Sequence, residues 1–233
     1  VIEVNPRSSR TVPFLSKATG YFLADIATLV ILGVSLKEQG FTESYAEEKN
    51  TWYVKAPAFS FSKISGLDAY LSPEMKSTGE AIGYDEKLTR AMYKALQASG
   101  ITLTDHGTVL VTVADEDKDE TFPLVKRFYK LGFNIVATEM TADYLKERGI
   151  KTRVYGKICE GNDDILRDIR SGKINYVINT RAILSGKHYE DGYIIRRCAV
   201  ENKATMFTSL DTVRMLLEVL EEMTIGISTI DGR

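Results

Sequence analysis

The stretch EVNPRSSRTVPF, residues 3–14, places an acid, an amide and two arginines close together near the start of the chain. Val1, Ile2 and Val4 are apolar and β-branched as in a strand, and Pro6 would end the pairing of that strand because proline has no N–H. Alternate side chains of a strand share a face, so Glu3 and Asn5 would point the same way. Two oxygen ligands suit Mg²⁺, which leaves its other positions to phosphate and water.

Arg7 and Arg10 follow directly, and their forked guanidinium groups could hold phosphate oxygens. The stretch therefore has the composition of a metal and phosphate site. The same residues also fit a solvated strand end whose charges are incidental, and their spacing alone does not separate the two interpretations.

The composition excludes several classes of protein. A net charge of −2 gives no electrostatic case for nucleic acid, and no apolar run approaches membrane-spanning length. Cys159 and Cys198 are the two cysteines and lack metal spacing, which predicts free thiols in a reducing cytoplasm. The two histidines are too few and too isolated for a zinc site. A strand that begins at Val1, with no methionine, predicts a fragment of a larger chain.

The first part of the chain, residues 1–98, mixes helix and strand patterns. Residues 17–35 and 85–98 have helical spacing, the second with Asp85 as the cap, and residues 51–64 alternate like a strand. Residues 71–83 are rich in Gly, Pro, Ser and Thr and predict a loop. Residues 99–106 are polar and predict a linker to a second domain, residues 107–233.

That second domain alternates apolar strands with helices. This pattern predicts an α/β fold with a doubly wound, parallel, five-stranded sheet. The expected strands are residues 108–115, 133–139, 152–157, 174–180 and 204–209. The expected helices are residues 118–132, 141–149 with Thr141 as N-cap, 163–172, 190–203 and 210–223.

Hydroxyl, amide and ammonium groups follow four of these strands. Ligands of such sheets bind beyond the carboxyl ends of the strands, and helix N-termini there attract anions. The groups therefore predict a phosphorylated small ligand, although each residue alone also fits a cap or a solvated surface. They are Thr112, Asp115, Lys118, Thr138, Thr141, Lys157, Asn179 and Thr180.

The whole chain resembles the carboxyl-terminal end of the large subunit of carbamoyl-phosphate synthase. VIEVNPRSSRTVPFLSKATG resembles the end of its second ATP-grasp unit, and LSPEMKSTGEAIG resembles a stretch that follows it. GTVLVTVADEDK, FNIVATEMTADYL, KICEG, INYVINT and DGYIIRRCAVE resemble its regulatory domain, which shares a fold with methylglyoxal synthase. The resemblance implies an ATP-dependent ligase that makes carbamoyl phosphate for pyrimidine and arginine biosynthesis.

The resemblance also implies roles for the first stretch. Glu3 and Asn5 would hold the Mg²⁺ or Mn²⁺ that bridges the phosphates of the substrate ATP, and Arg7 and Arg10 would be catalytic phosphate contacts. The nucleotide-binding part of the ATP-grasp would lie upstream, so we expect the isolated chain to be inactive. Implied partners are the rest of the large subunit and a glutamine amidotransferase small subunit, with homo-oligomers left open.

In the regulatory domain the resemblance implies a nucleotide effector, UMP or IMP, of which we favour UMP. Thr138, Thr141 and Lys157 would hold its phosphate. The base and ribose would lie among Thr112, Lys118, Asn179 and Thr180. Three residues depart from the family pattern: Met140, Cys159 and Arg181.

Two alternatives remain. A methylglyoxal-synthase-like lyase acting on a triose phosphate needs an aspartate base after paired glycines, but Asn162 stands there and an amide cannot abstract a proton. His188 and Asp191 do resemble parts of that lyase site. A pure oligomerisation module would bind neither nucleotide nor triose phosphate.

Overall fold

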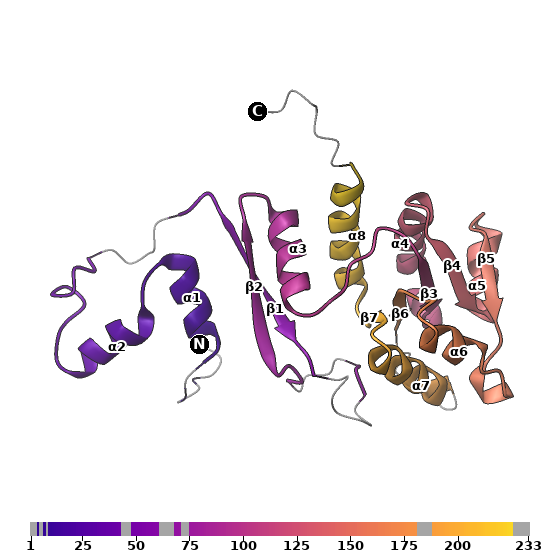
Figure 1. Cartoon of the computed structure of the whole chain (residues 1–233), viewed down its shortest axis with the longest axis horizontal. Coiled ribbons are helices and arrows are strands. Elements are labelled where there is room, and N and C mark those ends of the chain that lie inside the picture. Colours follow the sequence, from indigo (N-terminus) through magenta and orange to yellow (C-terminus); the bar gives the residue numbers. More distant parts are fainter. Residues whose placement is uncertain are drawn as a thin grey trace. The chain divides into compact units, whose positions relative to one another are not determined.

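The computed structural model describes residues 4, 7, 9–42, 48–60, 68–70, 75–180 and 188–225. Its contacts divide the chain into two compact units (Figure 1). The first unit comprises residues 1–58 and 79–100, and the second comprises residues 59–78 and 101–233. Each unit is described by itself.

The first unit begins with two helices, α1 (Thr11–Thr19) and α2 (Leu23–Ile31). The prediction of one helix over residues 17–35 is therefore wrong. Gly20 ends α1 with a φ of 87°, a left-handed conformation that glycine adopts without strain, and its N–H bonds the carbonyl of Ser16. No single described helix is long and apolar enough to cross a membrane, although α1 and α2 would pass that test as a pair bent by 107°.

An antiparallel pair of strands follows, β1 (Trp52–Ala58) and β2 (Gly79–Asp85). The prediction of a loop over residues 71–83 is wrong for residues 79–83, which form the first part of β2. The misleading residue is Gly83, whose added Cβ would lie 2.0 Å from the carbonyl oxygen of Ala91. Glycine here lets a helix pack directly on the strand, so it marks close packing and not a turn.

That helix is α3 (Leu88–Ala98), which ends at Ala98 as predicted. Its N-cap is Lys87 and not Asp85. The Asp85 carboxylate instead accepts the Lys87 N–H at 3.1 Å, in a turn just before the helix.

The second unit contains a five-stranded sheet in the order β5-β4-β3-β6-β7, with every neighbouring pair parallel. The α/β fold and the five-stranded parallel sheet are therefore confirmed. The strands are β3 (Thr108–Thr112), β4 (Asn134–Thr138), β5 (Thr152–Tyr155), β6 (Tyr176–Asn179) and β7 (Thr205–Phe207).

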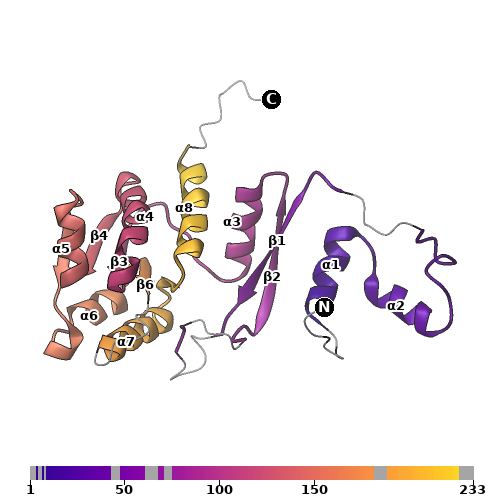
Figure 2. The same ribbon diagram turned by 180° about the vertical axis from the view of Figure 1, so that it is seen from behind.

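Helices cover both faces of this sheet (Figures 1 and 2). The apolar core on one face includes residues of α4, α5 and α8, and the core on the other includes residues of α6 and α7. The chain turns from one face to the other after β5, which makes the sheet doubly wound. The helices are α4 (Lys118–Lys130), α5 (Glu139–Glu147), α6 (Asp164–Arg170), α7 (His188–Glu201) and α8 (Leu210–Ile225).

Candidate functional site

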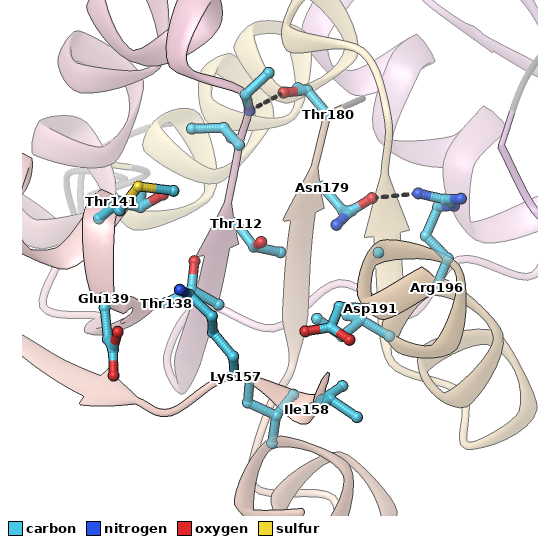
Figure 3. A pocket seen from close by; sticks show the side chains of 16 residues that line it. Thr112, Thr138, Glu139, Thr141, Lys157, Ile158, Asn179, Thr180, Asp191 and Arg196 are labelled. Carbon is cyan, nitrogen blue, oxygen red and sulfur yellow. Dashed lines mark hydrogen bonds between the residues drawn. The ribbon is translucent and has the colours of Figure 1, made fainter. Parts of the chain in front are cut away.

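The candidate site lies where the strand order reverses. β3 is paired with β4 on one side and with β6 on the other, while the connections after β3 and β6 leave toward opposite faces. Such a switch point opens a crevice beyond the carboxyl ends of the strands. A cavity of about 130 Å³ lies there, lined by the ends of β3, β4 and β6 and by parts of α5 and α7 (Figure 3).

Strand periodicity gathers three of the predicted residues. Alternate residues of a strand share a face, so Thr112 follows Leu110 toward α6 and α7. Thr138 follows Val136, and Asn179 follows Val177, onto the same face. Thr112 and Asn179 are also register partners at the end of the β3–β6 ladder. All three side chains line the cavity (Figure 3).

Thr141 enters the cavity from the first turn of α5. Its predicted role as N-cap is wrong: α5 begins directly after β4, so Thr138 is the N-cap, and its side chain makes no capping bond. The reason is that β4 runs into α5 without a loop, which moves the cap back by three residues. Thr141 is therefore a buried residue of the helix, 3% exposed, and lines the cavity.

Lys157 brings positive charge to the cavity from the short connection after β5. Its ammonium group lies 3.4 Å from a carboxylate oxygen of Glu160, and its side chain is 27% exposed. Glu160 is itself more than half exposed, so the pair is solvated and weak. An anion in the cavity could therefore compete with Glu160 for the Lys157 ammonium.

The remaining two predicted effector residues have structural partners. Thr180 lines the cavity, and its hydroxyl oxygen accepts the Ala114 N–H at 3.0 Å, which ties the end of β6 to the segment after β3. Lys118 is not among the lining residues. Its ammonium lies 2.6 Å from Asp115 and donates to the Met140 carbonyl at 3.2 Å, so it joins the start of α4 to α5.

Among the further lining residues, Asp191, Gly192 and Arg196 come from α7. The sequence raised Asp191 only within the lyase alternative and gave no signal for the other two. The Asp191 carboxylate accepts the Cys159 N–H at 3.2 Å. Desolvation of the Cys159 thiol and its hydrogen bond to Asp191 raise the pKa of that thiol, which keeps it neutral at pH 7.

Arg196 is buried, with 2% of its side chain exposed, and donates to three oxygens. Its Nε and Nη2 each bond the Asp68 carboxylate at 2.8 Å, and its Nη1 bonds the Asn179 Oδ1 at 2.7 Å (Figure 3). Burial would raise the pKa of Asp68, but the hydrogen bonds from Arg196 and from the Tyr70 N–H outweigh it, and the pKa is lowered. Asp68 therefore neutralises the buried guanidinium as a carboxylate.

The charges make the two ends of the cavity different. In Figure 3, Lys157 and Thr138 lie near each other, while the Asp191 carboxylate lies on the α7 side. A second lining carboxylate, Glu139, is exposed and lies beyond Thr138 from α7. A carboxylate repels an anion, whereas hydroxyls and an ammonium attract one. The arrangement suits a ligand whose phosphate faces Lys157 and Thr138 and whose uncharged part lies toward α7.

The predicted metal and catalytic residues belong to the first unit. Glu3 and Asn5 lie outside the described residues, as do Arg181 and the side chain of His188. Arg7 and Arg10 are both exposed, and Arg10 is the N-cap of α1. Within the described ranges, no group of three or more His, Cys, Asp or Glu side chains could hold a metal ion.

Comparison with known proteins finds a family match over part of the second unit. Residues 120–208 match the family described as MGS-like domain, a span that includes Thr138, Lys157, Asn179 and Arg196. Among solved structures, the chain is similar to "Crystal structure of ForH", with 18% identity, a TM-score of 0.42, and coverage of 51% of this chain and 81% of that one. It is also similar to a methylglyoxal synthase from Elizabethkingia anophelis NUHP1, with 21% identity, a TM-score of 0.40, and coverage of 49% and 79%. At these TM-scores the likenesses add nothing to the sheet order already described.

Proposed function

We propose that the cavity of the MGS-like domain binds a small phosphorylated effector, a nucleoside monophosphate such as UMP or IMP. The observation that carries the proposal is the meeting of Thr112, Thr138, Thr141, Lys157 and Asn179 in one cavity at the switch point. Together they offer hydroxyl, amide and ammonium donors to an anion. The first turn of α5 adds backbone N–H groups and the positive end of its helix dipole.

We further propose that the chain is the carboxyl-terminal part of a carbamoyl-phosphate synthase large subunit, in which this domain regulates ATP-dependent synthesis. The sequence motifs of both units support this, and so does the surface of α2. Ile31, the last residue of α2, is 84% exposed, and Leu32, which follows it, is 73% exposed. Phe22, which directly precedes α2, is 72% exposed. Exposed apolar clusters usually become buried against another surface, as they would against the rest of an ATP-grasp domain.

The lyase alternative rests on Asp191, whose carboxylate lines the cavity where a base could act. Against it stands Asn162, the residue in place of the expected aspartate. Its amide oxygen accepts the Asp164 N–H at 2.9 Å in a turn just before α6, and Asn162 is not among the lining residues. We therefore favour binding without turnover.

Calorimetry on the intact chain with UMP, IMP and a triose phosphate tests these proposals. We expect a nucleotide to bind and to be released unchanged. Release of inorganic phosphate from the triose phosphate would instead establish the lyase, and no binding of any of the three ligands would reject the effector site. In the complete synthase, the same nucleotide should alter the rate of carbamoyl phosphate formation.

A further inference from the structure

The contacts of Arg196 determine which end of the Asn179 amide faces the cavity. The guanidinium has only N–H donors and no acceptor. Its Nη1 lies 2.7 Å from one polar atom of the Asn179 amide, and Asn179 is 2% exposed. The opposite orientation would set two donors against each other in a buried place, at a cost of an unsatisfied polar group. The oxygen of Asn179 must therefore face Arg196.

The amide nitrogen then faces away from Arg196, toward the space between Thr112 and Asp191 (Figure 3). Within the part of the chain that the structure describes, the Nδ2 of Asn179 makes no hydrogen bond. Asn179 thus presents two N–H donors to the cavity and no acceptor.

Asp68 holds the guanidinium of Arg196, which in turn orients the side-chain amide of Asn179. The two parallel hydrogen bonds between Asp68 and Arg196 fix the plane of the guanidinium and balance its charge. Arg196 cannot turn away from Asn179 without breaking them inside a buried pair, which is strongly unfavourable.

Gly192 leaves space for the contact between Arg196 and Asn179. A Cβ at this position of α7 would lie 3.2 Å from the Arg196 Nη1 and 3.6 Å from the Asn179 Nδ2. Glycine inside a helix is destabilising relative to alanine. Its presence here leaves space for the guanidinium and the amide to meet at the cavity wall.

We propose that Arg196, anchored by Asp68, is a positioning residue that holds Asn179 with its NH₂ toward the cavity, so that the ligand places a hydrogen-bond acceptor there. The inference rests on the proposed effector site and adds a chemical requirement to it. The acceptor is a phosphate oxygen or a carbonyl oxygen of the base. A ligand that turns only an N–H donor toward Asn179 is rejected.

The direct test is the side-chain NH₂ signal of Asn179 in a ¹H–¹⁵N NMR spectrum of the intact chain. The signal is identified by its loss in Asn179→Asp. Titration with UMP should move it downfield, as expected for a donor that gains an acceptor. Binding of UMP, measured by calorimetry on the same sample, without movement of this signal would overturn the proposal while leaving the effector site in place. Failure of UMP, IMP and inorganic phosphate to bind at all would overturn both.

A matched pair of substitutions measures the effect on affinity. Asn179→Asp replaces the donor by an acceptor of the same shape and should weaken UMP binding by about tenfold to a hundredfold. Asn134→Asp adds the same charge at an exposed site at the start of β4, at the other end of the sheet, and should leave affinity within about twofold. Equal affinities for the Asn179→Asp variant and the wild type would contradict the proposal.

Inorganic phosphate separates the two sources of the acceptor. If Asn179→Asp weakens phosphate and UMP alike, beyond the effect of Asn134→Asp, the acceptor is a phosphate oxygen. If only UMP is weakened, the acceptor belongs to the nucleoside. Both results support the proposal.

The role of Arg196 is tested at constant charge. In the double variant Asp68→Asn/Arg196→Gln the buried pair is neutral, and the introduced glutamine can donate to or accept from Asn179, so the amide is free to turn. We expect weaker UMP binding than in the wild type and a second NH₂ signal for Asn179. Arg196→Lys, which also keeps the net charge, retains a donor without acceptors and should bind UMP more tightly than the double variant. A double variant with wild-type affinity and a single NH₂ signal would reject the positioning role.

Discussion

At the scale of single residues, Lys157 provides the ammonium that lines the cavity. Its present partner, Glu160, is on the solvent side and holds it weakly. A bound phosphate would replace this pair by a shorter, charge-assisted hydrogen bond supported by the hydroxyls of Thr138 and Thr141. The affinity for an anion should therefore depend more on Lys157 than on either threonine.

We predict that Lys157→Ala weakens UMP binding by about tenfold to a hundredfold, because a charge-assisted hydrogen bond contributes roughly 1.5–3 kcal/mol. Thr141→Val should cost less, since it removes one neutral bond. Lys151→Ala, which removes an exposed lysine before β5, is the control for overall charge and should have little effect. Calorimetry at two salt concentrations checks the ranking, and affinity should fall as salt rises. Equal binding by Lys157→Ala and Lys151→Ala would show that the phosphate site is misplaced.

The residues that could be predicted are those set by local periodicity. Parallel strands and two-residue alternation suffice to bring Thr112, Thr138 and Asn179 to one edge and one face of the sheet. Arg196 could not be found this way, because its carboxylate partner lies 128 residues earlier in the chain. The helical pattern of α7 does not distinguish Arg196, which is buried against this distant carboxylate, from the adjacent Arg197, which is solvated.

At the scale of elements, the same contrast appears between the two units. The strands and helices of the second unit follow from apolar runs, since both faces of its sheet are covered and its inner strands β3, β4 and β6 are largely buried. In the first unit, the pattern of β2 predicts a loop because its glycines and polar residues hide a strand that packs closely on α3. Glycine has two opposite meanings, turn or close contact, and only tertiary packing decides between them.

The ion pair between α7 and the segment before β2 should stabilise the second unit. We predict that Asp68→Asn lowers the free energy of unfolding by about 3 kcal/mol, because it leaves the buried Arg196 without a carboxylate. Glu201→Gln breaks the exposed pair with Arg197 on the same helix and should cost under about 1 kcal/mol. Urea unfolding of the two variants measures the difference, and similar losses would mean that Arg196 finds water or another partner.

A second buried carboxylate makes stability depend on pH. Asp168 of α6 is 2% exposed and accepts hydrogen bonds from the Tyr155 hydroxyl at 2.6 Å and from Lys173 at 2.9 Å. The Tyr155 bond, then the Lys173 bond, lower the pKa of Asp168. Burial and the bond to Asp168 raise the pKa of Tyr155 to about 12. The pair therefore stabilises the fold only while Asp168 is ionised and Tyr155 is protonated.

The sign of the effect follows from these shifts. The folded pKa of Asp168 lies below its unfolded value of about 3.9, so its contribution is present above that pH and is lost as pH falls through the folded pKa. The stabilisation that comes from Tyr155 is fully present below its unfolded pKa of about 10, and it is lost as pH rises through the folded pKa of about 12. We predict that Asp168→Asn flattens the acid limb of a plot of unfolding free energy against pH. Asp143→Asn, at an exposed site on α5, should leave that limb unchanged, and an acid limb that persists in Asp168→Asn would assign it to other carboxylates.

At the scale of the whole molecule, the two units differ in how much they bury. The second unit has a complete sheet with an apolar core on each face, whereas α1 and α2 contain no buried residue. The first unit therefore has little to hold α1 and α2 in place on its own, which fits the proposal that it is part of a larger ATP-grasp domain. The second unit has what an independent domain needs.

Unfolding measurements can locate where the longer segment of the second unit, residues 101–233, begins to contribute to its stability. The hydroxyl of Tyr176, a fully buried residue of β6, accepts the Thr104 N–H at 2.7 Å and donates to the Thr104 carbonyl at 2.9 Å. Residues 101–106 therefore contribute to the second unit, although their polar sequence is that of a linker. We predict that a fragment of residues 101–233 unfolds cooperatively. A fragment of residues 107–233 should fold as well but be less stable by about 1–3 kcal/mol, because the Tyr176 hydroxyl loses both partners.

Tyr176→Phe in both fragments distinguishes this bond from a general effect of length. Phenylalanine has no hydroxyl to satisfy, so the substitution should destabilise the longer fragment and remove most of the difference between the two. Urea unfolding of the four proteins gives the comparison as a double-mutant cycle. A difference that survives Tyr176→Phe would place the contribution of residues 101–106 in other contacts, such as the bond from the Thr205 hydroxyl to the Thr102 carbonyl. Failure of both fragments to fold would show instead that the second unit depends on residues 59–78, which carry Asp68.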